Sequence, residues 1–153
     1  MSTQLSNVIP EKISIKSIVV FNCQIQAGEL YLEQPVRWNK VNVHTKYEFS
    51  FNIEKKLSRL RLHMICNTFE NEHELELTGE FGIEYFFEIE NLDDLIFEEE
   101  SENKIDARLM VTLISLGFST SRGVVLEKTQ NTFLKGIILP VIDPVELLRQ
   151  GEK

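Results

Sequence analysis

Hydrophobic and polar residues alternate along most of the first two-thirds of the chain, as expected for β-strands that bury one face. The first alternating segment covers residues 13–26 and the second covers residues 41–54, both with apolar side chains mainly at odd positions. Residues 28–40 break the pattern and contain Pro35 and the only tryptophan, Trp38. We therefore expect two strands joined by a long connection.

The third alternating segment has its apolar residues at even positions, and the fourth, residues 75–89, has them at odd positions. A polar stretch, residues 70–72, separates the two and predicts a hairpin, with Arg61 opposite Glu80 and His63 opposite Thr78. In that arrangement both polar sets share one face of the sheet and both apolar sets share the other. Glycines within the fourth segment predict a β-bulge near Gly79 or Gly82.

The pattern becomes helical after the fourth segment. Residues 92–103 are acidic and predict a solvated loop or a short helical turn, and a helical spacing of apolar residues starts at Ile105. Gly117 leaves open whether that long helix is interrupted before residues 119–130 continue it. Asp143 as N-cap and Pro144 as first helical residue predict a final short helix that stops at Gly151. The order predicts a single α+β domain, residues 1–153, with a four-stranded antiparallel sheet covered by helices on one face.

Composition narrows the range of functions. The 153 residues include 16 Lys plus Arg and 24 Asp plus Glu, a formal net charge of −8. This charge disfavours nucleic-acid binding, because a phosphate backbone attracts clustered cations. No segment resembles a signal peptide or an apolar span of about 20 residues, so we expect a cytoplasmic protein with no membrane insertion. Cys23 and Cys66 lie in alternating segments and are expected to be reduced core thiols.

Nothing in the sequence predicts an enzyme, a metal site or a cofactor. His44, His63 and His73 lie on different segments and have no Cys or His partner at a ligand spacing. The alternating glutamates of the fourth segment are expected to stay solvated and ionised, which does not suit catalysis. Ten Phe, three Tyr and Trp38 leave two interpretations open: the tryptophan fixes its loop to the core, or it belongs to an exposed apolar surface for an oligomer or a peptide-like ligand.

Short motifs along the chain resemble those of the SecB export chaperones and the related SecB-like chaperones of toxin–antitoxin systems. Thr132 and Phe133, followed by residues 139–141 and 143–148, resemble the stretch between the family's long and last helices. Trp38 resembles the tryptophan that ends the family's crossover loop. Residues 121–123 resemble part of the long helix, and Gly82 with Ile83 a step in the fourth strand.

The resemblance implies an ATP-independent chaperone, or holdase, that performs no chemistry. It implies a dimer that extends the sheet, a homotetramer built as a dimer of dimers, and hydrophobic grooves that bind non-native polypeptides such as preproteins. The residues that correspond to groove positions are Val36, Trp38, Val145 and Leu148.

The resemblance also implies an acidic sheet face that, in SecB, docks the export motor SecA. Here Glu74, Glu76 and Glu80 are the candidate docking residues, while Asn22 and Gln26 stand where the family has acids. This departure puts SecA binding in doubt and leaves open a dedicated client, such as an antitoxin. Two alternatives remain. The protein is a non-enzymatic adaptor that binds a basic partner through the acidic face, or the acidic face is only solvated and binds no partner.

Overall fold

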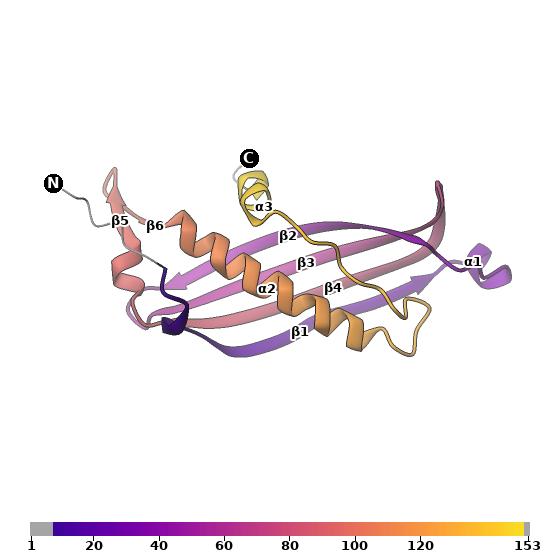
Figure 1. Cartoon of the computed structure of the whole chain (residues 1–153), viewed down its shortest axis with the longest axis horizontal. Coiled ribbons are helices and arrows are strands. Elements are labelled where there is room, and N and C mark those ends of the chain that lie inside the picture. Colours follow the sequence, from indigo (N-terminus) through magenta and orange to yellow (C-terminus); the bar gives the residue numbers. More distant parts are fainter. Residues whose placement is uncertain (1–7, 152–153) are drawn as a thin grey trace.

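The structure, a computed structural model that describes residues 8–151, is built around a four-stranded antiparallel sheet. Helices α2 and α3 lie on one face of this sheet, and α2 crosses it obliquely (Figure 1). The strand order is β1-β4-β3-β2, so β1 and β2 form the two edges. The predicted α+β class, sheet and helices are confirmed. The main elements are β1 (Ile13–Ala27), β2 (Lys40–Asn52), β3 (Leu57–Glu70), β4 (His73–Ile89), α2 (Ala107–Lys128) and α3 (Pro144–Gly151).

Smaller elements lie at the two ends of the sheet. The connection between β1 and β2 contains the one-turn helix α1 (Glu29–Glu33). The acidic stretch after β4 forms a 3-10 turn (Leu92–Leu95) and a hairpin of β5 (Ile96–Glu99) and β6 (Glu102–Ile105), which projects from the opposite end (Figure 1). A second 3-10 turn, Pro10–Lys12, precedes β1. The hairpin was not predicted, because strands of four residues around the turn at Glu100 and Ser101 are too short to show an alternation.

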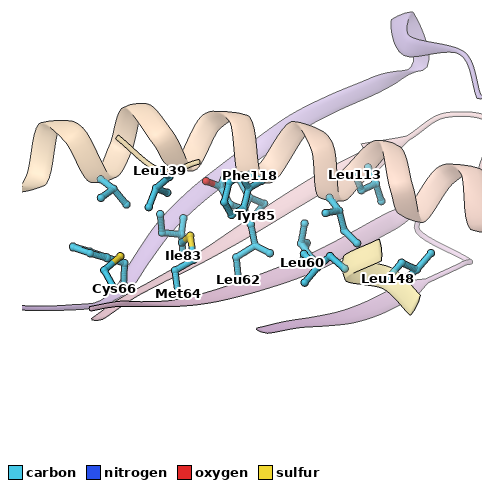
Figure 2. Close-up of a cluster of buried hydrophobic side chains, with 14 of the residues drawn as sticks. Leu60, Leu62, Met64, Cys66, Ile83, Tyr85, Leu113, Phe118, Leu139 and Leu148 are labelled. Atoms are coloured by element: carbon cyan, nitrogen blue, oxygen red, sulfur yellow. The ribbon is translucent and has the colours of Figure 1, made fainter. Parts of the chain in front are cut away.

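One continuous hydrophobic core lies between the sheet and the helices (Figure 2). Tyr85 on β4 lies beneath α2, and its hydroxyl shares a buried hydrogen bond of 2.6 Å with Ser121 Oγ. Because the Ser121 hydroxyl already donates to the Gly117 carbonyl, the tyrosine is the donor. Burial raises the pKa of Tyr85 to about 12, so the phenol keeps its proton. The strand residues of this core include Leu60, Leu62, Met64, Cys66, Phe81, Ile83 and Phe87.

Helix α2 runs without a break through Gly117. A Cβ atom at this position would lie 3.0 Å from Leu60 Cδ2 and 3.3 Å from Leu62 Cδ1, so the glycine allows the helix to approach the sheet closely. Asp106 is the N-cap of the helix, and its carboxylate accepts a hydrogen bond of 2.8 Å from the Arg108 backbone N–H. Side-chain hydrogen bonds from Arg108 also lower the pKa of Asp106. By length and composition alone, α2 could cross a membrane, contrary to the expectation that no segment is apolar enough to do so. In this fold one face of the helix covers the core.

Alanine substitutions at the two glycines of α2 should have opposite effects on stability. Gly123 is exposed and has open space where a Cβ would stand, so Gly123→Ala should stabilise the fold by about 0.5–1 kcal/mol through helix propensity. Gly117→Ala gains the same propensity but crowds two fully buried leucines, and overpacking of this kind costs about 1–3 kcal/mol. Equilibrium unfolding in denaturant measures both changes. Equal stabilisation by the two substitutions would show that α2 does not pack tightly at Gly117.

The register of the β3–β4 hairpin differs from the predicted one by four residues. Arg61 lies opposite Glu84, not Glu80, and His63 lies opposite Gly82, not Thr78. The turn consists of two residues, with Asn71 at a φ of 56°, and an irregularity between Asn67 and Phe69 shifts the pairing further. The face assignment was nevertheless correct, because the basic residues of β3 and the acids of β4 are in contact on the face away from α2.

Strand β1 does not keep the predicted odd-position pattern. Extra residues at Lys16 and Phe21 shift its pairing with β4 twice, so that Ile18 and Val20 face the core side between the two bulges. The bulge that was predicted in β4 near Gly82 is found instead in β1, at Phe21, next to Gly82. The Phe21 ring lies over Gly82, where a Cβ would overlap it. Cys23 is exposed on this edge strand, so only Cys66 is a core thiol, with its pKa raised to about 12 by burial.

Candidate functional site

The connection between β1 and β2 packs against the loop that follows α2. The Trp38 indole Nε1–H donates a hydrogen bond of 2.9 Å to the Phe133 carbonyl oxygen, across 95 residues of sequence. The Tyr31 and Phe133 rings meet edge-on at 5.4 Å, and the Tyr31 hydroxyl donates to the Val36 carbonyl at 3.1 Å. These contacts hold three aromatic residues from distant segments in one place.

The two segments enclose an open hollow of about 500 Å³, which we call the Trp38 hollow. Five of its eight lining residues are aromatic or aliphatic, and Phe133 is 50% exposed to solvent. Trp38 is half-buried, and its indole fixes the loop, as one of the two interpretations expected; it also lines the hollow. The lining residues are Tyr31, Pro35, Val36, Arg37, Trp38, Phe133, Lys135 and Gly136.

Gly79 explains how the loop after α2 reaches this place. Leu134 is fully buried, and a Cβ at Gly79 on β4 would lie 2.6 Å from its Cδ1 atom. The missing side chain that interrupts the alternation of β4 thus leaves room for Leu134. Residues 133–136 form turns, in which the Lys135 N–H donates to the Thr132 carbonyl. Phe133 and Lys135 are exposed on either side of the buried Leu134, and Gly136 has a φ of +86°.

Helix α3 supplies the other two predicted groove residues, at a different place. Its first turn is capped as predicted by Asp143, whose carboxylate accepts from the Val145 N–H at 3.0 Å. Val145 is 46% exposed, whereas Leu148 is buried and its carbonyl accepts a hydrogen bond of 2.8 Å from the Tyr47 hydroxyl. Leu148 therefore packs beneath the exposed side of α3, whereas Val145 is part of that exposed side.

The structure brings Val36 and Trp38 together but separates them from Val145 and Leu148. Tyr47, which holds α3, is about 23 Å along β2 from the end nearest Trp38. The segment between the Trp38 hollow and α3 buries Ile137 and Leu139 and exposes Ile138 and Val141, at 72% and 83%. We name the exposed members of this surface the apolar track. They are Phe133, Ile138, Val141 and Val145.

Sequence reasoning missed most of the apolar track. Phe133, Ile138 and Val141, and Tyr31 of the neighbouring Trp38 hollow, were not predicted as site residues, although the sequence contained a signal for the track. Residues 137–142 are apolar at nearly every position, whereas an extended surface segment can bury only alternate ones. Such a run predicts exposed hydrophobic side chains once it is known to lie on a surface.

The acids of the sheet face are engaged within the fold. Glu80 Oε1 lies 2.8 Å from His63 Nε2, and Glu84 lies 3.3 Å from Arg59 and 4.0 Å from Arg61. Glu76 accepts a hydrogen bond of 3.2 Å from the Leu30 N–H, at the start of α1. Glu74 is exposed, near the β3–β4 turn.

The substituted positions Asn22 and Gln26 lie opposite Gly82 and Thr78. The Arg61 guanidinium also stacks over the Phe21 ring, 4.2 Å from its centre. The sheet face is thus of mixed charge, with cations from β3 beside the glutamates of β4. Within residues 8–151, no three His, Cys, Asp or Glu side chains group together as metal ligands would.

Comparison with known proteins gives a structural likeness. No family model matches the chain, and no curated protein matches it in sequence. A solved SecB-like chaperone from Mycobacterium tuberculosis, in complex with a ChAD peptide from the HigA1 antitoxin, superposes with a TM-score of 0.55. The match covers 86% of this chain and 91% of that one, at 11% identity. The fold is SecB-like.

A protein of unknown function from Streptococcus agalactiae also matches, with a TM-score of 0.43 and 14% identity, over 84% of this chain and 97% of that one. The SecB-like fold places the crossover connection, the loop after α2 and α3 in the order that the sequence resemblance implied.

Proposed function

We propose that this protein is an ATP-independent chaperone that holds non-native polypeptides on the Trp38 hollow and the apolar track. The observation that carries the proposal is the exposure of large hydrophobic side chains along one continuous stretch, residues 133–145, beside an aromatic hollow. Soluble proteins bury or cover such patches unless they bind something. The SecB-like neighbour, which was solved with a polypeptide bound, supports the same conclusion.

The chemistry of the surface suits an unfolded client. A non-native chain exposes apolar side chains at irregular intervals, and an aromatic wall accepts any of them without demanding one sequence. The hollow, about 500 Å³, is large enough for an aromatic side chain and its neighbours. Binding of this type needs neither nucleotide nor a chemical step.

Two client classes are compatible with this activity. Preproteins on their way to export are the first, and a cytoplasmic location belongs to the same proposal. A dedicated client such as an antitoxin is the second, and the peptide bound to the neighbouring structure favours it. SecA docking is less favoured, because Glu76 and Glu80 have partners within the fold and Asn22 and Gln26 are uncharged. The adaptor alternative, which needs free acids on the same face, loses support for the same reason.

An oligomer forms part of the proposal. Strand β1 is a sheet edge of 15 residues with exposed Ile15, Ile18, Val19 and Phe21, each between 41% and 44% accessible. An uncovered edge of this length and hydrophobicity favours pairing with a second copy, which would extend the sheet. We propose that two such dimers form the homotetramer.

Suppression of aggregation tests the proposed activity. The purified protein should keep several chemically unfolded clients from scattering light at a near-stoichiometric ratio, and added ATP should change nothing. Persistence of the effect at high ionic strength is expected, because apolar contacts resist screening. Failure with every client would contradict the proposal, and loss of binding at moderate salt would favour the adaptor.

A further inference from the structure

The Trp38 hollow is lined by positively charged side chains, whereas the chain as a whole has a negative net charge. Its two charged lining residues are both cations: Arg37 comes from the connection before β2, and Lys135 comes from the loop after α2. Both are exposed, and within residues 8–151 neither lies within ion-pair distance of a carboxylate. The nearest acid in sequence, Glu33, is not part of the lining.

The surroundings of the hollow extend this pattern. Residues 34–41 and 128–136, which supply most of the lining, contain four Lys and Arg residues and no Asp or Glu. The whole chain has a net charge of −8, and acids crowd the β5–β6 hairpin at the other end of the sheet (Figure 1). The charged lining of this aromatic site is therefore cationic on an acidic protein, and the nearby Glu29 and Glu33 lie on α1 outside the lining. Some basic side chains of the sheet, such as Arg59 and Arg61, contact carboxylates, whereas Arg37 and Lys135 form no ion pair with any residue that the structure describes.

We infer that the hollow selects client segments in which an aromatic or aliphatic side chain is flanked by Asp or Glu. This inference rests on the proposed function and specifies its client. The apolar side chain enters the aromatic wall, the Arg37 guanidinium pairs with one carboxylate through two N–H groups, and Lys135 attracts another as a point charge. A client with basic flanks meets like charge at both places and is disfavoured.

The geometry of an extended client backbone predicts which positions of the client should carry Asp or Glu. In an extended client, residues two apart point to the same side and are separated by about 7 Å. An apolar residue at position i that enters the hollow therefore presents the side chains of i−2 and i+2 to its rim. The best client has carboxylates at both of these positions.

The single tryptophan makes a direct test possible. Three unstructured peptides would be compared, each with one central Phe and no Trp or Tyr, and each with Glu, Gln or Lys at the two positions i−2 and i+2. Affinity is measured by Trp38 fluorescence and, independently, by anisotropy of labelled peptide. The Glu peptide should bind about three- to tenfold more tightly than the Gln peptide at low salt, and the Lys peptide more weakly than either. The difference should shrink at high salt.

Charge reversal supplies the matched comparison. The double variant R37E/K135E should reverse the order of the three peptides. A control with the same change in net charge far from the hollow, K55E/K104E, should keep it; Lys55 follows β2 at its far end and Lys104 lies on β6.

These measurements distinguish the selectivity of the hollow for acidic flanks from the proposed chaperone activity. Equal affinity for the three peptides would overturn the selectivity and leave the chaperone proposal standing. Absence of binding by all three in both measurements, together with failure to suppress aggregation, would overturn the proposed function. Reversal of the order by K55E/K104E would show that net charge, not the rim of the hollow, controls the preference, which would also overturn the inference.

Discussion

Replacing Trp38 with alanine is expected to weaken the capture of an unfolded polypeptide by about thirtyfold or more. The indole forms part of the aromatic wall, and its N–H also fixes the loop that carries Phe133. Truncation of a central tryptophan at an interface commonly costs about 2 kcal/mol or more, which corresponds to that factor. Titration of a labelled, permanently unfolded client measures the effect.

Two further variants make this result specific. Trp38→Phe keeps an aromatic ring but lacks the donor to the Phe133 carbonyl, and should bind with intermediate affinity. Phe97→Ala removes another aromatic side chain, 49% exposed on β5 at the other end of the sheet, and should leave capture unchanged. Unchanged capture by Trp38→Ala, or equal losses in Trp38→Ala and Phe97→Ala, would contradict the assignment of the site.

Replacing Phe118 with alanine is expected to have the largest effect on stability. Its ring is fully buried between α2 and the sheet, close to Tyr85 (Figure 2). Loss of a buried phenylalanine costs about 3–5 kcal/mol, through lost burial and the cavity that remains. Because a domain is stable by only about 5–15 kcal/mol, the variant should unfold at a much lower denaturant concentration.

The matched control lies two residues away on the same helix. Leu116 is 38% exposed, so Leu116→Ala should lower the free energy of unfolding by about 1 kcal/mol at most. Similar losses at the two positions would mean that α2 does not face the sheet as described. Equilibrium unfolding in denaturant, followed by far-UV circular dichroism, compares the two variants.

The sequence predicted the elements whose pattern is regular. Strands β2, β3 and β4 alternate along most of their length because one face of each lies toward the core, and that periodicity is visible in the chain itself. The N-cap residue and the proline at the start of α3 also predicted the beginning of that helix correctly. Gly117 could not be interpreted from sequence alone, because a helix-breaking glycine and a glycine at a close helix–sheet contact look the same until the sheet is placed.

Long-range pairing was less predictable. The bulges at Lys16 and Phe21 reverse the faces of β1 twice, and only the pairing with β4 reveals them. The β3–β4 register depended on the length of the turn and on the irregularity after Asn67, neither of which changes the apolar pattern. Periodicity therefore determined which face each side chain takes, but not which residue it meets.

The candidate site was predicted in part. Trp38 was conspicuous as the only tryptophan in an irregular connection, and the family resemblance added Val36 and α3. The contact between Trp38 and Phe133 spans 95 residues, so no local pattern could indicate it. The mixed charge of the sheet face was predicted from the hairpin, but the individual partners of the glutamates were not, because they depend on the register.

Hydrogen exchange with and without a permanently unfolded client tests the central claim most directly. The account predicts that the client protects backbone amides in residues 35–39, 131–139 and 141–145, which form the Trp38 hollow and the apolar track. Amides of the outward sheet face around His63 and Glu80 should exchange at unchanged rates. Protection confined to that sheet face, or no protection at all under conditions in which the client is bound, would contradict the account.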